Sequence, residues 1–288
     1  MAGYRAWPTV AAITPTICEL LGIAPPALCS SAPLDEVLLA ARAAFDGSSA
    51  EKCLIYAPDA IGNRLYVAHP DLRALVIRVA PVAVSLRSVV PPITPVAFAS
   101  MFTGAEPAQH GIRESVRPVL KCDTLFDALT RAGKRVAVRR QRRRISRSFR
   151  TAIVAVTRSS IELMYRERDL DYFSEEYDPQ VTARAVSLVE ADGHDVIVAY
   201  HQEYDDAMHA HGPFAAKAVQ AARNNISAFA EIARAFDTHW KAYHRVIAFT
   251  PDHGAHADPA TPPGRGAHGD DIPDDMALTH FFGLRAAE

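Results

Sequence analysis

The 288-residue chain combines 49% hydrophobic with 22% charged residues, which is typical of a folded protein with one substantial core. Its formal net charge of -2 excludes a general electrostatic preference for nucleic acid or anionic membranes, so an anionic ligand must be attracted by a local site. The cysteines form no CxxC pair and have no close spacing, which argues against a zinc knuckle or a disulfide framework.

The N-terminal residues give no sign of export. Pro8, Pro15 and Glu19 interrupt the one apolar stretch there, so no signal peptide is predicted. No segment is long and apolar enough to span a bilayer. We therefore expect a cytoplasmic protein that does not associate with membranes.

Helical patterns recur along the chain. Segment 13–26 predicts a helix that Thr14 caps and Pro15 starts. Further helices are predicted from Asp123 or Thr124 to Gly133, from Asp178 to about Gly193, and from Pro213 to about Tyr243.

Short apolar, β-branched runs alternate with these helices. Strands are predicted at 53–58, at either 135–138 or 153–156, at 196–200, at 246–250 and, as a last strand at the sheet edge, at 276–284. This rhythm indicates an α/β fold with a mostly parallel central sheet and helices on both faces. We expect one domain over residues 1–288 with little structure capping it.

One segment departs from this rhythm. Residues 138–150 are rich in arginine, contain no acidic residue and show little apolar periodicity, so a basic loop insertion is predicted. Two interpretations stay open: a flap over an anionic substrate or a nucleic-acid contact, or a solvated loop. The solvated loop is favoured because like charges repel. Nucleic acid is therefore not an expected partner.

Acidic residues follow three of the predicted strands. Asp59 follows the first strand, Asp205 and Asp206 follow strand 196–200, and Asp252 follows the next strand. Ligands of open parallel sheets bind outside the carboxyl ends of the strands. We therefore expect these carboxylates to lie together on one rim of the sheet.

Histidines accompany these acids, since ten of the twelve lie between His194 and His280. Mixed Asp and His sets are typical ligands of zinc. Asp205 and His209 are four residues apart, so one helical turn allows both to reach one ion. A single residue of this kind is more often a cap or a surface side chain, but the combination favours a metal site. The histidines concerned are His209, His211, His253, His256 and His268.

A nucleophile for such a site is available in segment 91–112. Thr94 precedes Pro95, a favoured first helical residue, and an apolar helix is predicted from there to Gly104. A hydroxyl at a helix N-terminus lies in positive potential that favours an alkoxide and a bound phosphoryl group. Thr94 is equally explained as an ordinary N-cap, and spacing alone leaves both interpretations open.

Five motifs together resemble type I phosphodiesterases and nucleotide pyrophosphatases of the alkaline phosphatase superfamily. In chain order they are PDAIGNRL (58–65), TPVAFASMFTG followed by HGI (94–112), DDAMHAHGP (205–213), TPDHG (250–254) and GAHG followed by DDM (266–276). The resemblance implies an alkaline phosphatase-like fold and a hydrolase with two divalent metal ions, Zn²⁺ or alternatively Mn²⁺.

The resemblance also implies roles for individual residues. One ion would be held by Asp59, Thr94, Asp252 and His253, and the other by Asp205, His209 and His268. Candidate contacts to substrate are Ser115, Asp206, His211 and His256. The asparagine that such pyrophosphatases use near the phosphate has no counterpart at Glu114 or Ser115, so a nucleotide substrate is not indicated.

Two further points follow from the resemblance. Segment 13–26 is similar to a helix that such enzymes carry near the C-terminus. Either the order of elements in this chain is rearranged, or the segment is an ordinary amphipathic helix, and both interpretations stay open. The interval between His253 and His268 is too short for a large inserted domain, so segments 113–122 and 139–175 are expected to select the substrate.

The expected reaction is attack of Thr94 on phosphorus, followed by hydrolysis of a covalent phospho-threonine. A threonine nucleophile resembles that of enzymes acting on diesters and pyrophosphates, and the expected partner is a small phosphoester. Alternatives on the same scaffold are a phosphomutase, a phosphomonoesterase or a phosphonate hydrolase. A metal-binding protein without turnover is the remaining alternative, disfavoured because all seven residues of the site are present.

Overall fold

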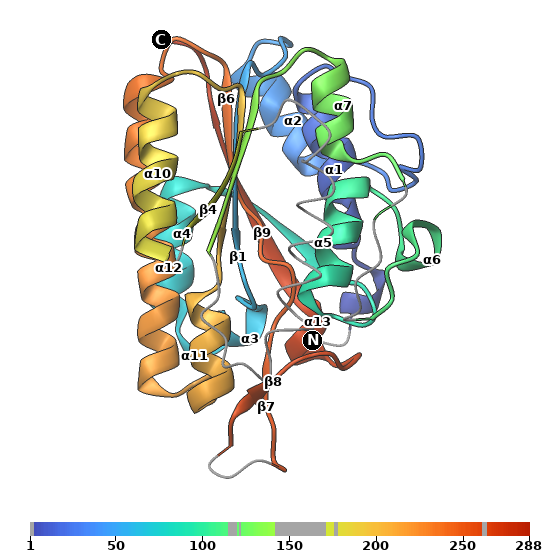
Figure 1. Cartoon of the computed structure of the whole chain (residues 1–288), viewed down its shortest axis with the longest axis vertical. Coiled ribbons are helices and arrows are strands. Elements are labelled where there is room, and N and C mark those ends of the chain that lie inside the picture. The colour runs from blue at the N-terminus through green and yellow to red at the C-terminus, as the bar shows by residue number, and fades with distance from the viewer. Residues whose placement is uncertain (1–2, 115–119, 121, 142–170, 176–177, 261–263) are drawn as a thin grey trace.

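A seven-stranded sheet runs through the protein in the order β2-β9-β6-β1-β5-β3-β4 (Figure 1). The computed structural model describes residues 3–114, 120, 122–141, 171–175, 178–260 and 264–288. The strands of this sheet are β1 (Lys52–Pro58), β2 (Val82–Arg87), β3 (Val136–Gln141), β4 (Asp171–Glu175), β5 (Val196–His201), β6 (Arg245–Phe249) and β9 (Ala277–Arg285). A separate two-stranded ribbon consists of β7 (His256–Ala257) and β8 (Gly266–Ala267).

The sheet is mostly parallel, as the sequence predicts. Neighbouring strands from β6 to β4 all pair in parallel, whereas β9 pairs antiparallel with β6 and with β2. Every residue of β1, β5 and β6 is buried, which explains their unbroken apolar sequences.

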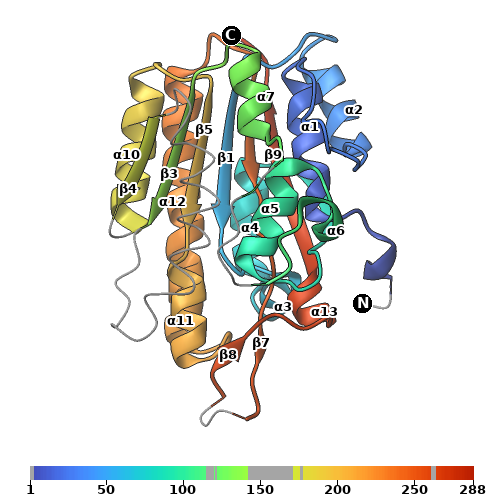
Figure 2. The ribbon, with the colours of Figure 1, turned by 45° about the vertical axis from the view of Figure 1, so that its right-hand side comes forward.

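Helices cover both faces of the sheet (Figures 1 and 2). On one face an apolar cluster includes residues of α1 (Ile13–Leu20), α2 (Asp35–Ala44), α5 (Thr94–Thr103) and α7 (Leu125–Arg131). On the other, a second cluster includes residues of α3 (Asn63–Ala68), α4 (Pro70–Val79), α10 (Asp178–Glu190), α11 (Glu203–His211) and α12 (Ala216–His239). Short elements complete the described chain: α6 (Pro107–His110), α13 (Pro273–Met276) and 3-10 turns at Tyr4–Ala6 and Val10–Ala12.

The last strand is not at the sheet edge, contrary to the prediction. β9 lies between β6 and β2, and its residues Ala277–Gly283 are buried. The strand that occupies the edge beside it, β2, has an alternating burial pattern and was not predicted. An edge strand buries only one face, and this gives β2 a weaker apolar signal than the internal strands.

The arginine-rich segment also differs from the prediction. Residues 138–141 do not belong to a loop but form the last four residues of β3, which pairs with β5 and β4. Backbone pairing on both sides stabilises strand conformation regardless of the arginine side chains. Residues 142–150 and the alternative strand 153–156 lie outside the described residues.

Helix starts are partly as predicted. Thr124, not Asp123, caps α7, because its hydroxyl accepts from the Asp127 amide in a capping box. Thr14 is not a cap: α1 begins at Ile13, and the Thr14 hydroxyl donates to the Met101 carbonyl of α5. Tertiary packing against α5 has replaced the local role that spacing suggested.

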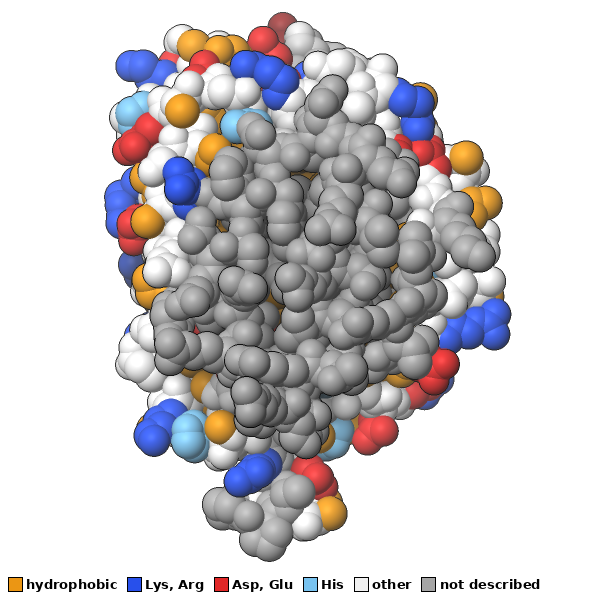
Figure 3. Space-filling model, viewed as in Figure 1, with side chains coloured by type: hydrophobic (Ala, Val, Ile, Leu, Met, Phe, Trp, Pro, Cys, Tyr) orange, Lys and Arg blue, Asp and Glu red, His pale blue; other side chains and the backbone are white. Residues whose placement is uncertain are grey.

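Charge on the described surface is mixed. In Figure 3, basic and acidic side chains alternate around the outline of this face. This distribution agrees with the net charge of -2. Among the helices of the described ranges, none combines the length and apolar character needed to cross a membrane.

Candidate metal centre

Three neighbouring strands end where the predicted site residues lie. β1 is flanked by β5 and β6, and all three run in parallel, so their carboxyl ends meet on one rim. Asp59 directly follows β1, and Asp252 and His253 lie just after β6. Helix α11 begins just after β5 and carries Asp205 and His209.

The first set of side chains is the Thr94 group, which comprises Asp59, Thr94, Asp252 and His253. The Nε2 atom of His253 lies 3.3 Å from Asp59 Oδ1 and 3.4 Å from Asp252 Oδ2. The Thr94 hydroxyl oxygen lies 3.1 Å from the same Nε2 and donates to both Asp59 oxygens at 3.4 Å. All four residues are buried, and their polar atoms converge on one point.

Thr94 does not cap its helix. It is the first helical residue of α5, Ile93 occupies the cap position, and no side chain caps the helix. The hydroxyl of Thr94 is therefore directed to Asp59 and His253 instead of to backbone amides. It lies at the positive end of a ten-residue helix, where a negative oxygen is stabilised. Of the two interpretations open from spacing, the N-cap is wrong, and the nucleophile stays a prediction.

The second set is the Asp205 group, which comprises Asp205, His209 and His268. The Nε2 atoms of His209 and His268 lie 3.3 Å and 3.5 Å from Asp205 Oδ1. Asp205 and His209 are one turn apart on α11, and His268 follows β8. The rings of His268 and His253 stack with their centroids 4.0 Å apart, so the Asp205 group adjoins the Thr94 group.

The structure distinguishes these residues from their neighbours in sequence. Asp206 accepts a hydrogen bond from Gln202 Nε2 at 3.2 Å and belongs to neither group, and His211 is exposed at the end of α11. Ser115 lies outside the described residues. The substrate contacts expected of Ser115, Asp206 and His211 stay predictions.

His256 lies in a third cluster, close in sequence to both groups. Its Nδ1 is 2.8 Å from Oδ1 of the buried Asp275, and its Nε2 is 3.7 Å from Asp270 Oδ2. The second Asp275 oxygen accepts from the amides of Gly269 and Asp270. Asp275 thus holds both the His256 ring and the turn after His268, and a substrate contact for His256 stays a prediction.

Backbone carbonyls orient the three histidines of the two groups in the same way. The Nδ1 atoms of His253, His209 and His268 lie 3.0, 3.0 and 3.2 Å from the carbonyl oxygens of Gly254, Gly266 and Pro92. Because a carbonyl only accepts, each Nδ1 carries the proton and each Nε2 presents its lone pair. Metal-binding histidines are commonly held in this manner.

The electrostatics of the Thr94 group also fit a cation. Burial raises the pKa of Asp252 to about 7, and burial lowers the pKa of His253 and of His268. Within the described residues, Asp252 Oδ2 has no hydrogen-bond partner although Asp252 is wholly buried. A buried carboxylate oxygen beside a neutral imidazole is suited to binding a divalent metal, which would favour the ionised carboxylate.

These pKa shifts predict that metal binding releases protons in a pH-dependent manner. At pH 6, below its pKa of about 7, Asp252 is mainly protonated, and the ion must displace that proton. At pH 8 Asp252 is already ionised. Calorimetric titration with Zn²⁺ in buffers of different ionisation enthalpy should therefore show more protons released at pH 6 than at pH 8.

Matched variants test this assignment. Asp252→Asn should abolish the pH difference in proton release, whereas Asp206→Asn, an acidic neighbour outside both groups, should retain it. Equal proton release at pH 6 and pH 8 in the unmodified protein would show that Asp252 does not exchange a proton for metal.

Tyr200 is a site residue that sequence reasoning missed. Its buried hydroxyl donates to Asp59 Oδ2, and its position on β5 is opposite Ala57 of β1. The Asp59 oxygen is thereby held toward the Thr94 group. In the sequence, Tyr200 is one more residue of a buried, mostly apolar strand. Its hydroxyl group, near the carboxyl end of that strand, was the one feature that could have indicated a role in the site.

Comparison with known proteins identifies the family. The model of the type I phosphodiesterase / nucleotide pyrophosphatase family matches residues 58–261, which include the Thr94 group together with Asp205 and His209. The chain belongs to this family. A search of curated proteins finds no match.

Solved structures with the same fold include three from different sources. The chain matches phosphonoacetate hydrolase from Sinorhizobium meliloti 1021 with phosphonoformate (TM-score 0.51, 17% identity, 74% of this chain and 59% of that chain). It also matches the zinc complex of the C-terminal periplasmic domain of EcEptC from Escherichia coli, with a TM-score of 0.54 and 15% identity, over 85% of this chain and 75% of that chain. Murine ectonucleotide pyrophosphatase / phosphodiesterase 5 matches with a TM-score of 0.51 and 14% identity, over 73% of this chain and 58% of that chain.

These similarities confirm the alkaline phosphatase-like fold that the sequence predicts. The chain spans less than two thirds of the length of the phosphonoacetate hydrolase and of the murine protein. The identities are low, so the substrates of those proteins do not transfer to this chain.

Proposed function

We propose that this protein is a metal-dependent phosphodiesterase in which Thr94 is the nucleophile. The observation that supports this most strongly is the direction of the Thr94 hydroxyl, which contacts Asp59 and His253 within 3.4 Å although it begins a helix. The hydroxyl makes no helix-capping bond, and its printed contacts are with Asp59 and His253. Membership of the phosphodiesterase family supports the same reaction class.

The two groups fit two divalent ions. Asp59, Thr94, Asp252 and His253 would hold one, and Asp205, His209 and His268 the other. Bound ions, Zn²⁺ or alternatively Mn²⁺, would supply Lewis acidity that lowers the hydroxyl pKa and neutralises phosphoryl charge. Carboxylate and imidazole ligands together match the preference of zinc.

The chain's own residues account for two displacement steps. Asp59 accepts the hydrogen bond of the Thr94 hydroxyl, and the positive end of α5 stabilises the oxygen as it loses its proton. Thr94 Oγ1 then bonds to phosphorus while the bond to the leaving alkoxide breaks, giving a phospho-threonine. The hydroxyl proton passes by way of Asp59 to solvent, and the alkoxide takes up a proton from solvent to become the alcohol. Water next attacks phosphorus, the Thr94–phosphorus bond breaks, and the products are an alcohol and a phosphate monoester.

A diester substrate is proposed over a monoester, because a threonine nucleophile and the family model both support it. Purified protein should therefore hydrolyse bis-aryl phosphate at least about tenfold faster, in kcat/KM, than the matching aryl monoester. The assay should be run with Zn²⁺ and then with Mn²⁺, with analysis of products.

Clear monoester preference would contradict the diesterase proposal. Conservation of total phosphate ester, with transfer instead of hydrolysis, would indicate a phosphomutase. A chain that binds metal but turns over neither ester would support the non-catalytic alternative.

A further inference from the structure

We propose that Asp178 is a positioning residue for the Asp205 group: from the start of α10 it fixes where α11 begins. The consequence is that Asp178, 27 residues before Asp205, determines where Asp205 and His209 lie. The inference rests on the proposed function in one respect, namely that the Asp205 group is a metal site. It requires no particular substrate.

The first turn of α11 receives its hydrogen bonds from Asp178. A helix begins with amide groups that have no partner inside the helix, and α11 has no side-chain cap of its own. Asp178 Oδ1 accepts from the Gln202 amide at 3.3 Å, and Oδ2 accepts from the Glu203 amide at 2.8 Å. A carboxylate from another helix therefore takes the place of the missing local cap.

A second side chain completes this arrangement from α12. The side-chain Nδ2 of Asn225 donates to Asp178 Oδ2 at 2.9 Å, and the side-chain Oδ1 of Asn225 accepts from the backbone amide of Tyr204 at 3.3 Å. The Asn225 backbone is itself fixed by the Tyr56 hydroxyl from β1. Three consecutive amides, from Gln202 to Tyr204, are thus held by two buried side chains.

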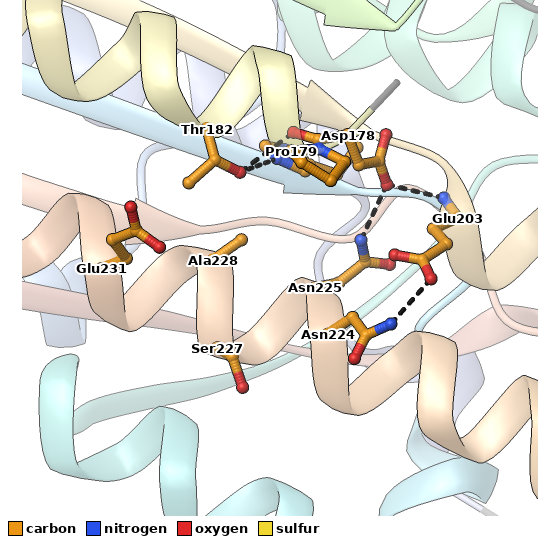
Figure 4. Close-up of a pocket in the computed structure, with 10 residues that line it drawn as sticks. Asp178, Pro179, Thr182, Glu203, Asn224, Asn225, Ser227, Ala228 and Glu231 are labelled. Atoms are coloured by element: carbon orange, nitrogen blue, oxygen red, sulfur yellow. Dashed lines mark hydrogen bonds between the residues drawn. The ribbon is translucent and has the colours of Figure 1, made fainter.

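Figure 4 shows two of these contacts at the wall of a cavity. Asp178 bonds to Glu203 and Asn225, whereas the Glu203 carboxylate points to Asn224. The cavity of about 630 Å³ leaves open space beside Asp178. Substitution by a side chain of similar size should therefore fit without steric conflict.

The position of α11 matters because both of its ligands depend on it. Asp205 is the third residue of the helix and His209 lies one turn later. A nine-residue helix is only marginally stable by itself, so its start and direction depend on tertiary contacts. Asp178 provides such contacts, and its negative charge suits the positive helix end.

The test uses Asp178→Asn. The asparagine side chain has the shape of aspartate, but one of its two acceptor oxygens is replaced by an NH₂ group, which cannot accept a hydrogen bond from the backbone amides. Glu203→Gln is the matched control: it removes a charge beside the same cavity without touching the helix-start amides. Val189→Ala, a core change in α10, controls for a general loss of stability. Zinc binding to each variant of the full chain is measured by competition with a chromophoric chelator.

We expect Asp178→Asn to weaken zinc binding at the Asp205 group by roughly tenfold, and to leave the affinity of the Thr94 group unchanged. Activity should recover when the zinc concentration is raised. Amide hydrogen exchange at residues 202–206 should quicken in Asp178→Asn. The Glu203→Gln and Val189→Ala variants should retain both wild-type affinities.

Unchanged zinc affinity in folded Asp178→Asn would overturn the proposal, and so would an equal loss in Val189→Ala. Failure of the proposed function would look different: wild-type protein would bind zinc without hydrolysing either ester. The zinc titration and amide exchange would still decide the role of Asp178 in that case.

Discussion

Thr94→Ala is expected to lose roughly 10³-fold or more in kcat on an aryl phosphodiester, because the substitution removes the hydroxyl proposed to attack phosphorus. The side chain contributes Oγ1 to the point where His253 Nε2 and the Asp59 carboxylate converge. Steady-state kinetics at saturating zinc measures this loss. Thermal unfolding of the variant, compared with that of the wild type, separates loss of the nucleophile from loss of folded protein.

Thr94→Ser is the matched control for the nucleophile. It retains a hydroxyl at the start of α5, so we expect its kcat to stay within about tenfold of the wild type. If Thr94→Ala turned over diester as fast as the wild type, water would be the attacking group. The Thr94 group and the Asp205 group would then promote a single displacement by water.

Asp205→Asn should give the second large effect, a loss of the ion that the Asp205 group is proposed to hold. Asp205 Oδ1 lies within 3.5 Å of both histidines of this group, so the substitution removes the single anionic ligand common to them. Elemental analysis should find about one equivalent of zinc less per chain. Loss of an ion that stabilises transition-state charge should lower kcat roughly 10² to 10³-fold.

Neighbouring residues provide controls of the same chemistry. Asp206→Asn makes the same change one residue away, where the side chain bonds to Gln202, and His211→Gln changes an exposed histidine. Both variants should retain two equivalents of zinc, whereas His209→Gln should resemble Asp205→Asn. Zinc loss in Asp206→Asn but not in Asp205→Asn would reverse the ligand assignment.

The fold could be predicted where burial leaves a simple pattern. β1, β5 and β6 are buried along their whole length, so their apolar runs predict a parallel sheet. β2 was missed because its residues alternate between buried and exposed. The extension of β3 into arginines was missed because pairing with β4 and β5, not residue type, determines it.

Parallel strand order predicts that the acidic residues of the candidate site lie together, whereas the roles of Thr94 and His268 were implied by the family resemblance. Asp59 and Asp252 follow adjacent strands, and a helical turn brings Asp205 and His209 together. Supporting residues could not be predicted in this way. Asp178 and Asn225 reach the start of α11 through contacts between helices, and no spacing in the sequence indicates them.

The stereochemical course at phosphorus tests the role of Thr94 most directly. A phosphorothioate diester made chiral at phosphorus is hydrolysed in isotopically labelled water, and the configuration of the product is determined. Attack by Thr94 followed by attack by water inverts phosphorus twice, so net retention is expected. Net inversion would contradict it, because inversion requires a single displacement by water without a phospho-threonine.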